Sequence, residues 1–322
     1  MAPLALAITV SYEAKWIYFS LSILELAIGI LSNAFIVLVN AWDLVRRHQL
    51  SKFDSVLLCL GASRIFLQIL LFMDALHLTH FQVMRDPLSI KYKTVILFGM
   101  LVNQTSLWLA TWLSILYCAK IARVSHAFLI WLKGWLLMTI PQLLLGSLIF
   151  PWLSFFPCIW KHFSLSYSNS TVSFSGNITE NSIKERFIFF HFFLLCNLGN
   201  IFPFLLFLAS SSILIISLGR HMRTMTAQTT GSGDPSLEAH IIALRSLISF
   251  LLLYVIGFVA TLAAVPFTLL ISSKIGVMVC VGIMLTSPSV HSIILILSNN
   301  KLKRVLKSIL YWLRYFLKAC IV

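Results

Sequence analysis

The chain is poor in charge. Only 11% of its 322 residues are Asp, Glu, Lys or Arg, whereas 59% are hydrophobic. Soluble domains usually have about 25% charged and about 45–50% apolar residues. A single soluble core cannot bury this apolar excess, so we expect most of the chain to lie in lipid. The longest polar intervals, 156–185 and 218–240, leave no room for a soluble domain.

Motifs of enzymes and metal sites are missing as well. The sequence contains no His-Glu-x-x-His, no paired catalytic carboxylates and no phosphate-binding glycine loop. Its six cysteines have neither metal-ligand spacing nor a disulfide framework, and we interpret most of them as small apolar packing residues. We therefore predict a protein that is not an enzyme and that uses no metal and no cofactor.

In place of these features, the sequence has seven apolar stretches of about 20 residues or more, which is the length that crosses a bilayer. They lie near 17–41, 55–78, 92–118, 129–155, 186–217, 241–271 and 276–298. We predict an all-α membrane protein in which residues 1–298 form a seven-transmembrane helix bundle. In the cytoplasmic tail, 299–322, apolar residues such as Leu302 and Leu306 share one helical face, which is typical of a basic amphipathic helix on the inner leaflet.

Lys and Arg outside the apolar stretches predict the orientation. Fifteen of them lie on the side of the C-terminus and eight on the opposite side, and the side richer in basic residues is normally cytoplasmic. The N-terminus is then outside. The tripeptides that begin at Asn169 and Asn177 fit N-glycosylation of an outer loop. Membrane orientation, and not nucleic-acid binding, explains the net charge of +14.

Arg64 interrupts the second apolar stretch. A guanidinium stays charged in proteins, and insertion scales put its cost near the centre of a membrane helix at roughly 2.5 to 3.5 kcal/mol. Arg64 is therefore expected to face the interior of the bundle, with Asn33, His291 and Ser292 as its acceptors. This network would join the first, second and seventh spans, either as a switch between two arrangements or as a static clamp.

Two common receptor motifs are absent, because the third span has no Asp-Arg-Tyr and the seventh has no Asn-Pro-x-x-Tyr. Other motifs are distributed along nearly the whole chain: Glu25-x-x-x-Gly29-x-x-x-Asn33, Leu60-Gly-Ala-Ser63-Arg64, Leu107-Trp108-Leu-Ala-Thr111, Lys120-Ile121-Ala-Arg-Val-Ser125-His126, Ser217-Leu218-Gly-Arg220-His221, Asp234-Pro235-Ser236 and Pro288-Ser-Val-His291-Ser292. On these motifs together, the chain resembles the bitter taste receptors, the type 2 taste receptor family.

This resemblance implies a multi-pass plasma-membrane receptor for structurally varied bitter small molecules. It also implies coupling to a gustducin-type heterotrimeric G protein, with signalling through phospholipase C to calcium release. A vomeronasal type 1 pheromone receptor has similar architecture, but the Asp234-Pro235 and His291-Ser292 motifs favour the taste receptors. A transporter or channel is the alternative from another class, and the lack of repeated halves disfavours it. The agonist and the oligomeric state stay open.

We expect the ligand cavity among the outer halves of the second, third, fifth, sixth and seventh spans. The resemblance implies that Asn103 contacts ligand, although a helix-to-helix hydrogen bond is an equal alternative. Gly99 stands where the family often has tryptophan, and the absence of that ring is expected to enlarge the cavity. Asp74 is either solvated at the headgroup level or attracts cationic agonists. The remaining predicted pocket residues are Met100, Gln104, Gly257 and Val281.

A basic surface is predicted at the inner ends of the spans. Basic residues interleaved with apolar ones suit the docking of a G-protein helix, and attraction to anionic lipid accounts for part of the charge. The predicted G-protein-facing residues are Lys120, Arg123, His126, Arg220, His221, Asp234, Pro235 and His240.

Overall fold

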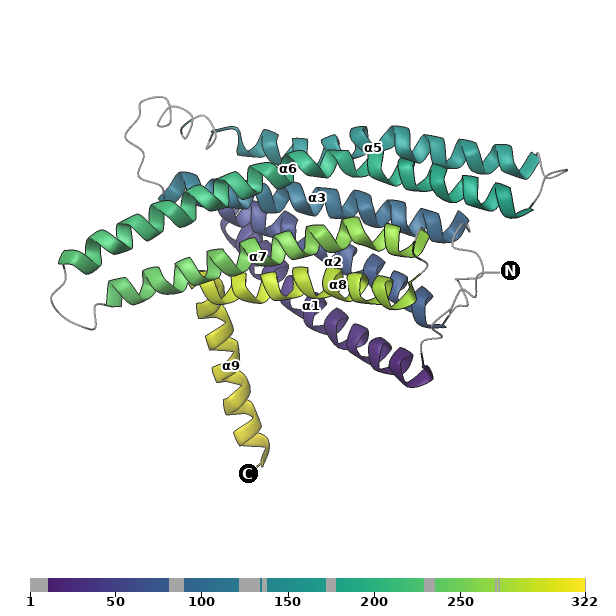
Figure 1. Cartoon of the computed structure of the whole chain (residues 1–322). Helices are drawn as coiled ribbons and strands as arrows, with labels where there is room; N and C mark the ends of the chain where they lie inside the picture. The colour runs from purple at the N-terminus through teal and green to yellow at the C-terminus, as the bar shows by residue number, and fades with distance from the viewer. Residues whose placement is uncertain are drawn as a thin grey trace.

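The computed structural model is a bundle of long helices that lie side by side (Figure 1). It describes residues 11–80, 90–121, 134, 138–171, 178–228, 235–269, 271 and 273–321. Within these residues, every regular element is a helix, and seven helices are long and apolar enough to cross a membrane. The predicted fold, an all-α bundle of seven membrane helices, is confirmed.

Most of the helices extend, at one or both ends, beyond the apolar stretches from which they were predicted. Their bounds are α1 (Tyr12–Arg47), α2 (Lys52–His80), α3 (Ile90–Ile121), α5 (Ile140–Thr171), α6 (Ile178–Gln228), α7 (Pro235–Leu269), α8 (Lys274–Ser298) and α9 (Asn300–Ile321). Hydropathy identifies only the part of a helix that is apolar enough for lipid. The helix itself can be longer, and α6 has 51 residues. The start of the predicted fourth span, 129–137, lies almost wholly outside the described residues, and its helix α5 continues past residue 155.

Local signals explain where α1 and α8 begin and end. The Ser11 hydroxyl accepts a hydrogen bond from the backbone N–H of Ala14 (3.2 Å), and Ser273 does the same for Gly276 (3.2 Å). Both are N-caps that satisfy an unpaired helical donor. α1 ends at His48, whose backbone is left-handed (φ 54°) and whose N–H bonds to the carbonyl of Leu44.

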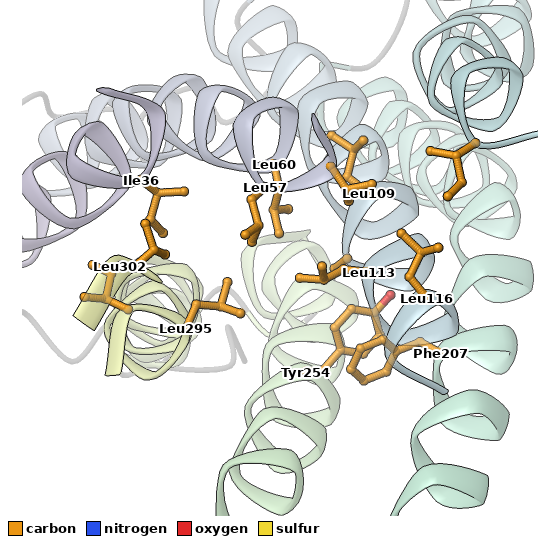
Figure 2. Packing of buried hydrophobic residues seen from close by; sticks show 14 residues of the cluster. Ile36, Leu57, Leu60, Leu109, Leu113, Leu116, Phe207, Tyr254, Leu295 and Leu302 are labelled. Atoms are coloured by element: carbon orange, nitrogen blue, oxygen red, sulfur yellow. The ribbon is translucent and has the colours of Figure 1, made fainter. Parts of the chain in front are cut away.

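A large apolar core lies near the end of the bundle at which α9 begins (Figure 2). Ile36 of α1 packs there with Leu295 of α8 and with Leu302 of α9, which is fully buried. Farther along the same core, the rings of Phe207 and Tyr254 stack with their centroids 3.8 Å apart. This core therefore joins α9 and the middle parts of α6 and α7 to the rest of the bundle.

α9 leaves the bundle at a steep angle and is fixed at its first turn (Figure 1). Lys301 contacts Asp43 (2.6 Å) and Asp54 (3.2 Å), and it donates to the side-chain oxygen of Asn40 (2.9 Å). Beyond this turn the side chains from 307 to 318 are exposed. The predicted amphipathic helix is present, and its place on the inner leaflet stays a prediction.

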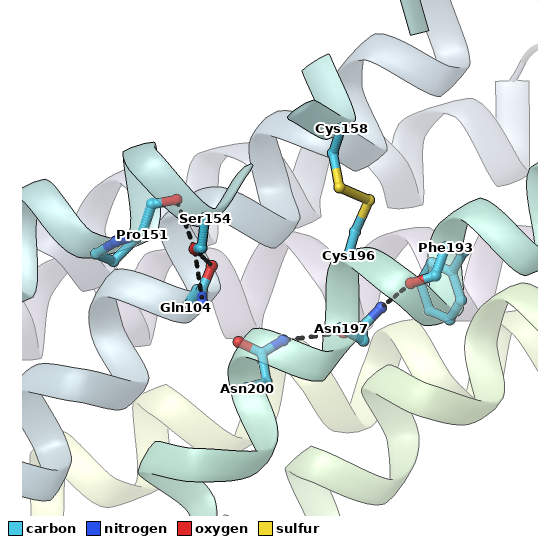
Figure 3. Close-up of a disulfide and its surroundings, with 8 residues drawn as sticks. All are labelled: Gln104, Pro151, Ser154, Cys158, Phe193, Cys196, Asn197 and Asn200. Atoms are coloured by element: carbon cyan, nitrogen blue, oxygen red, sulfur yellow. Dashed lines mark hydrogen bonds between the residues drawn. A yellow bond between two sulfur atoms is a disulfide. The ribbon is translucent and has the colours of Figure 1, made fainter. Parts of the chain in front are cut away.

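The reading of the cysteines was wrong for one pair. Cys158 of α5 and Cys196 of α6 form a disulfide with Cα atoms 6.2 Å apart (Figure 3). The two cysteines are 38 residues apart in sequence and belong to no compact motif. They meet because α5 and α6 are neighbours, which cysteine spacing alone does not reveal. Cys59, Cys118 and Cys280 are free in the described part of the chain.

Candidate functional site

The four residues of the predicted polar network lie together. Arg64 Nη1 is 2.7 Å from His291 Nδ1 and donates to Ser292 Oγ at 3.3 Å. Ser292 Oγ in turn donates to Asn33 Oδ1 at 2.7 Å. All four side chains are buried. Because a guanidinium can only donate, Nδ1 of His291 accepts in this contact, and a neutral imidazole then carries its proton on Nε2.

The network is in contact with a fourth helix. The ring of Phe250 on α7 lies 4.3 Å, centroid to centroid, from the ring of His291. Asn33 also donates to the backbone carbonyl of Gly29 at 2.9 Å, which fixes its amide within α1. A displacement of α7 therefore acts on His291 directly, whereas Asn33 and Arg64 are held by polar bonds to α1 and α8.

Sequence reasoning missed a second polar contact, one helical turn along from the first. The side chain of Gln68 donates to Ser289 Oγ and, at 3.4 Å, to the backbone carbonyl of Leu285. It occupies the space beside Gly29, where any Cβ would overlap it. The signal was available, because Gln68 follows Arg64 by four residues and residues at this spacing share a helix face.

Two small cavities lie inside the bundle. The first, which we call the outer cavity, has a volume of about 50 Å³ and is lined by residues from α2, α3, α6, α7 and α8. These are the five spans expected to form the ligand site. The second, the Arg64 cavity, has a volume of about 60 Å³ and includes Arg64 and His291. Asn103 lines both cavities, so it stands between the predicted ligand site and the polar network.

The structure places most of the predicted pocket residues in these linings. Asp74, Gly99 and Met100 line the outer cavity, and Gly257 lines the Arg64 cavity. A Cβ built at Gly99 meets no atom within 4 Å, so there is open space beside this glycine. Small-molecule pockets usually measure about 300–1,000 Å³. The outer cavity is smaller than this range, so it would have to widen to hold a small molecule.

Gln104 and Val281 lie outside both linings, which corrects their predicted position. Gln104 is fully buried between α3 and α5, with its Nε2 3.3 Å from Ser154 Oγ (Figure 3). As the residue after Asn103, it is turned by about 100° around the helix, away from the cavity. Val281 packs in an apolar cluster with Leu285 and other buried residues. One turn earlier on the same face, Val277 lines the outer cavity instead.

Hydroxyl groups also form hydrogen bonds between α3 and α6, and these contacts were not predicted from the sequence. Thr111 Oγ1 donates to the backbone carbonyl of Pro203 at 3.0 Å. Ser114 Oγ lies 2.9 Å from Ser210 Oγ and 3.0 Å from Ser211 Oγ. Thr111 and Ser114 are three residues apart, which places them on one face of α3. Hydroxyls at this spacing in an apolar run are typical of contacts between membrane helices.

The predicted inner surface is described only in part. Arg220 lies on α6 with its side chain exposed. Four residues lie in α3, α6 and α7, but their side chains are outside the description: Lys120, His221, Pro235 and His240. Arg123, His126 and Asp234 lie outside the described residues altogether. The same holds for the glycosylation site Asn177, and Asn169 lies in α5 with an undescribed side chain.

Comparison with known proteins adds independent information. The family model described as "Taste receptor protein (TAS2R)" matches residues 11–314. The chain is 34% identical to taste receptor type 2 member 40 of Gallus gallus, over 93% of this chain and 96% of the relative. It is 36% identical to taste receptor type 2 member 1 of Chlorocebus aethiops, over 91% and 95%. It is 35% identical to taste receptor type 2 member 9 of Papio hamadryas, over 94% and 96%.

Proposed function

The chain belongs to the taste receptor type 2 family, whose members are multi-pass receptors of the plasma membrane. It is therefore a bitter taste receptor that couples to G proteins, and it is not an enzyme. We propose that it detects bitter small molecules in the outer cavity and signals through a gustducin-type G protein to phospholipase C and calcium release. The observation that carries this proposal is Asn103, because its side chain lines both the outer cavity and the cavity of the Arg64 network.

In this mechanism, an agonist widens the outer cavity by displacing α3, α7 or α8 from one another. Asn103 shares in the displacement and perturbs the Arg64 cavity below it. His291 belongs to that cavity and contacts Phe250 of α7. A shift of α7 that changes this contact would alter the partners of Arg64, and the inner ends of α6 and α7 would then separate to admit a G-protein helix.

Two residues of the cavities are proposed to set agonist preference. Asp74 gives the outer cavity an acidic group, which favours cationic agonists in a membrane. Gly257 keeps the Arg64 cavity open, and a Cβ there would lie 3.0 Å from Ser287 Oγ. The walls around these residues are mainly apolar, and apolar contacts discriminate poorly between ligands. We therefore expect broad recognition of many compounds.

A calcium assay in transfected cells tests the proposal. A panel of bitter compounds is applied to cells that express the receptor with and without a gustducin-type α subunit. We expect several unrelated agonists, and responses only with the subunit present. Gly99→Trp should fill the outer cavity and abolish these responses at normal surface expression, whereas Gly146→Ala, on an open position of α5, should leave them unchanged. Full agonist responses of Gly99→Trp would overturn the assignment of the outer cavity.

A further inference from the structure

A third cavity, much larger than the two described above, lies outside the predicted ligand site. It has a volume of about 680 Å³ and lies between α1, α7 and α8. We call it the lateral cavity, because side chains at its rim are exposed on the perimeter of the bundle: Leu21 (53%), Ile256 (50%) and Val279 (55%). In a membrane this perimeter faces lipid. The volume falls within the range of ordinary small-molecule pockets, about 300–1,000 Å³.

The lining of the lateral cavity includes a carboxylate. Glu25 lies in the lining, and one of its oxygens accepts a hydrogen bond from Thr286 of α8. Ser22 and Met278 beside it are buried. The rest of the lining is mainly apolar and contains no Lys, Arg or His. The ion pairs of Lys301 of α9 with Asp43 and Asp54 do not involve Glu25, because Asp43 lies near the opposite end of α1.

An acidic side chain within a membrane helix normally pairs with a cation or lines a functional site. Glu25 has a hydrogen-bond donor but no cationic partner in the described part of the protein. A ligand that fits this cavity therefore combines an apolar body, which suits the walls, with a positive charge that reaches Glu25. We propose that the lateral cavity binds a lipophilic amine that enters from the lipid, with its ammonium group on Glu25.

This site is separate from the proposed agonist site. None of the residues that line the outer cavity lines the lateral one. Ser287 lines both the lateral cavity and the Arg64 cavity, and its hydroxyl donates to the backbone carbonyl of Leu253 on α7 at 3.1 Å. An amine in the lateral cavity thus contacts the seam between α7 and α8 from the lipid side.

The test measures thermal unfolding of the full-length receptor in nanodiscs of phosphatidylcholine, with N,N-dimethyldodecylamine as the probe and dodecan-1-ol as its uncharged counterpart. We expect a saturable rise of Tm with the amine, at concentrations where the alcohol gives none. Glu25→Gln should raise the amine concentration for half the shift at least tenfold. An equal shift from the alcohol, or an unchanged midpoint in Glu25→Gln, would overturn the proposal.

A second pair of variants keeps the test decisive if Glu25→Gln does not fold. A Cβ at Gly282 would lie 3.9 Å from the ring of Tyr18, an ordinary contact, so Gly282→Ala should retain the amine-dependent shift. Gly282→Leu places a larger side chain in the cavity and should abolish the shift. Gly99→Trp, which fills the outer cavity, should retain it. Loss of the shift in Gly99→Trp but not in Gly282→Leu would place the amine in the interior and refute the lateral site.

Discussion

The two sides of the bundle differ in the chemistry that holds them, although polar side chains also join α3 to α5 and α6. α1, α2 and α8 are joined by buried polar side chains, with Arg64 and Gln68 at successive turns of α2. α5 and α6 are joined by a disulfide and by aromatic packing, in which Trp108 of α3 has ring centroids 5.5 Å from Phe150 and 5.7 Å from Phe202.

This difference shows two solutions to one problem. Lipid tails are as apolar as leucine, so the hydrophobic effect does not hold membrane helices to one another. Polar side chains do so through hydrogen bonds that can exchange partners, whereas a disulfide and stacked rings cannot exchange in the same way. We therefore expect the Arg64 side to be able to rearrange during signalling, and the α5–α6 side to keep its outer contacts.

Breaking the Arg64 network should have the largest effect. Arg64→Ala leaves His291 and Ser292 without their charged donor, and each buried polar group that loses its partner costs about 1–3 kcal/mol. We expect a several-fold loss of surface expression, or altered basal calcium signalling in the receptors that reach the surface. Both are measured in cells, with Arg304→Ala on the exposed part of α9 as the control. Wild-type values in both assays would remove Arg64 from the mechanism.

Loss of the disulfide should come next. Cys196→Ser releases α6 from α5, and disulfides typically contribute about 2–4 kcal/mol. We expect a lower Tm for the purified receptor, and the same value for Cys158→Ser and for the double variant, because each removes one bond. Cys280→Ser, at a free cysteine, is the control. If the double variant melts lower than either single one, the cysteines act separately and not as a pair.

A single methyl group should weaken the polar side by a smaller amount. The Cβ of Gly29→Ala would overlap the side chain of Gln68, so the amide must move away from Ser289. A buried polar group that loses its partner costs about 1–3 kcal/mol, and we expect Tm to fall accordingly. In Gly146→Ala the added Cβ meets no atom within 4 Å, and Tm should stay equal or rise. Equal Tm values for Gly29→Ala and the wild type would show that the hydrogen bond from Gln68 to Ser289 does not contribute to stability.

The contact that fixes α9 should matter least. The side chains of Lys301 and Asp43 are 30% and 21% exposed, and exposed ion pairs contribute about 0–1 kcal/mol. We expect Lys301→Gln to lower Tm slightly in low salt and hardly at all in high salt, because salt screens the pair. A large fall of Tm that persists in high salt would mean that Lys301 acts through its bond to Asn40 instead.

The membrane bundle and the partners of Arg64 could be predicted because lipid imposes strict rules. Apolar stretches of spanning length have few alternatives there, and a buried guanidinium needs acceptors on other helices. The exact faces of the helices were harder to predict. Asn103 and Gln104 are adjacent and both polar, yet only Asn103 lines the interior cavities. The choice depends on the rotation of α3 in the bundle, which hydropathy does not determine.

The disulfide and the lateral cavity were beyond sequence reasoning for a related reason. Cys158 and Cys196 meet only after α5 and α6 have packed. The lateral cavity likewise depends on the gap that α1 and α7 leave over α8, so the sequence shows an acid within a span at Glu25 but not the cavity that it lines. Features made by the packing of several helices are visible only in three dimensions.

The length of α6 has a mechanical consequence. In Figure 1 the ends of α6 and α7 reach well beyond the point at which α9 leaves the bundle. Pro203 lies inside α6, where proline removes a backbone hydrogen bond and makes bending easier. From Pro203 to Gln228 the helix is about 37 Å long, so a bend of about 10° moves its far end by about 6 Å. The disulfide lies on the other side of Pro203, so a bend at this proline would move the far end of α6 much more than the part that is bonded to α5.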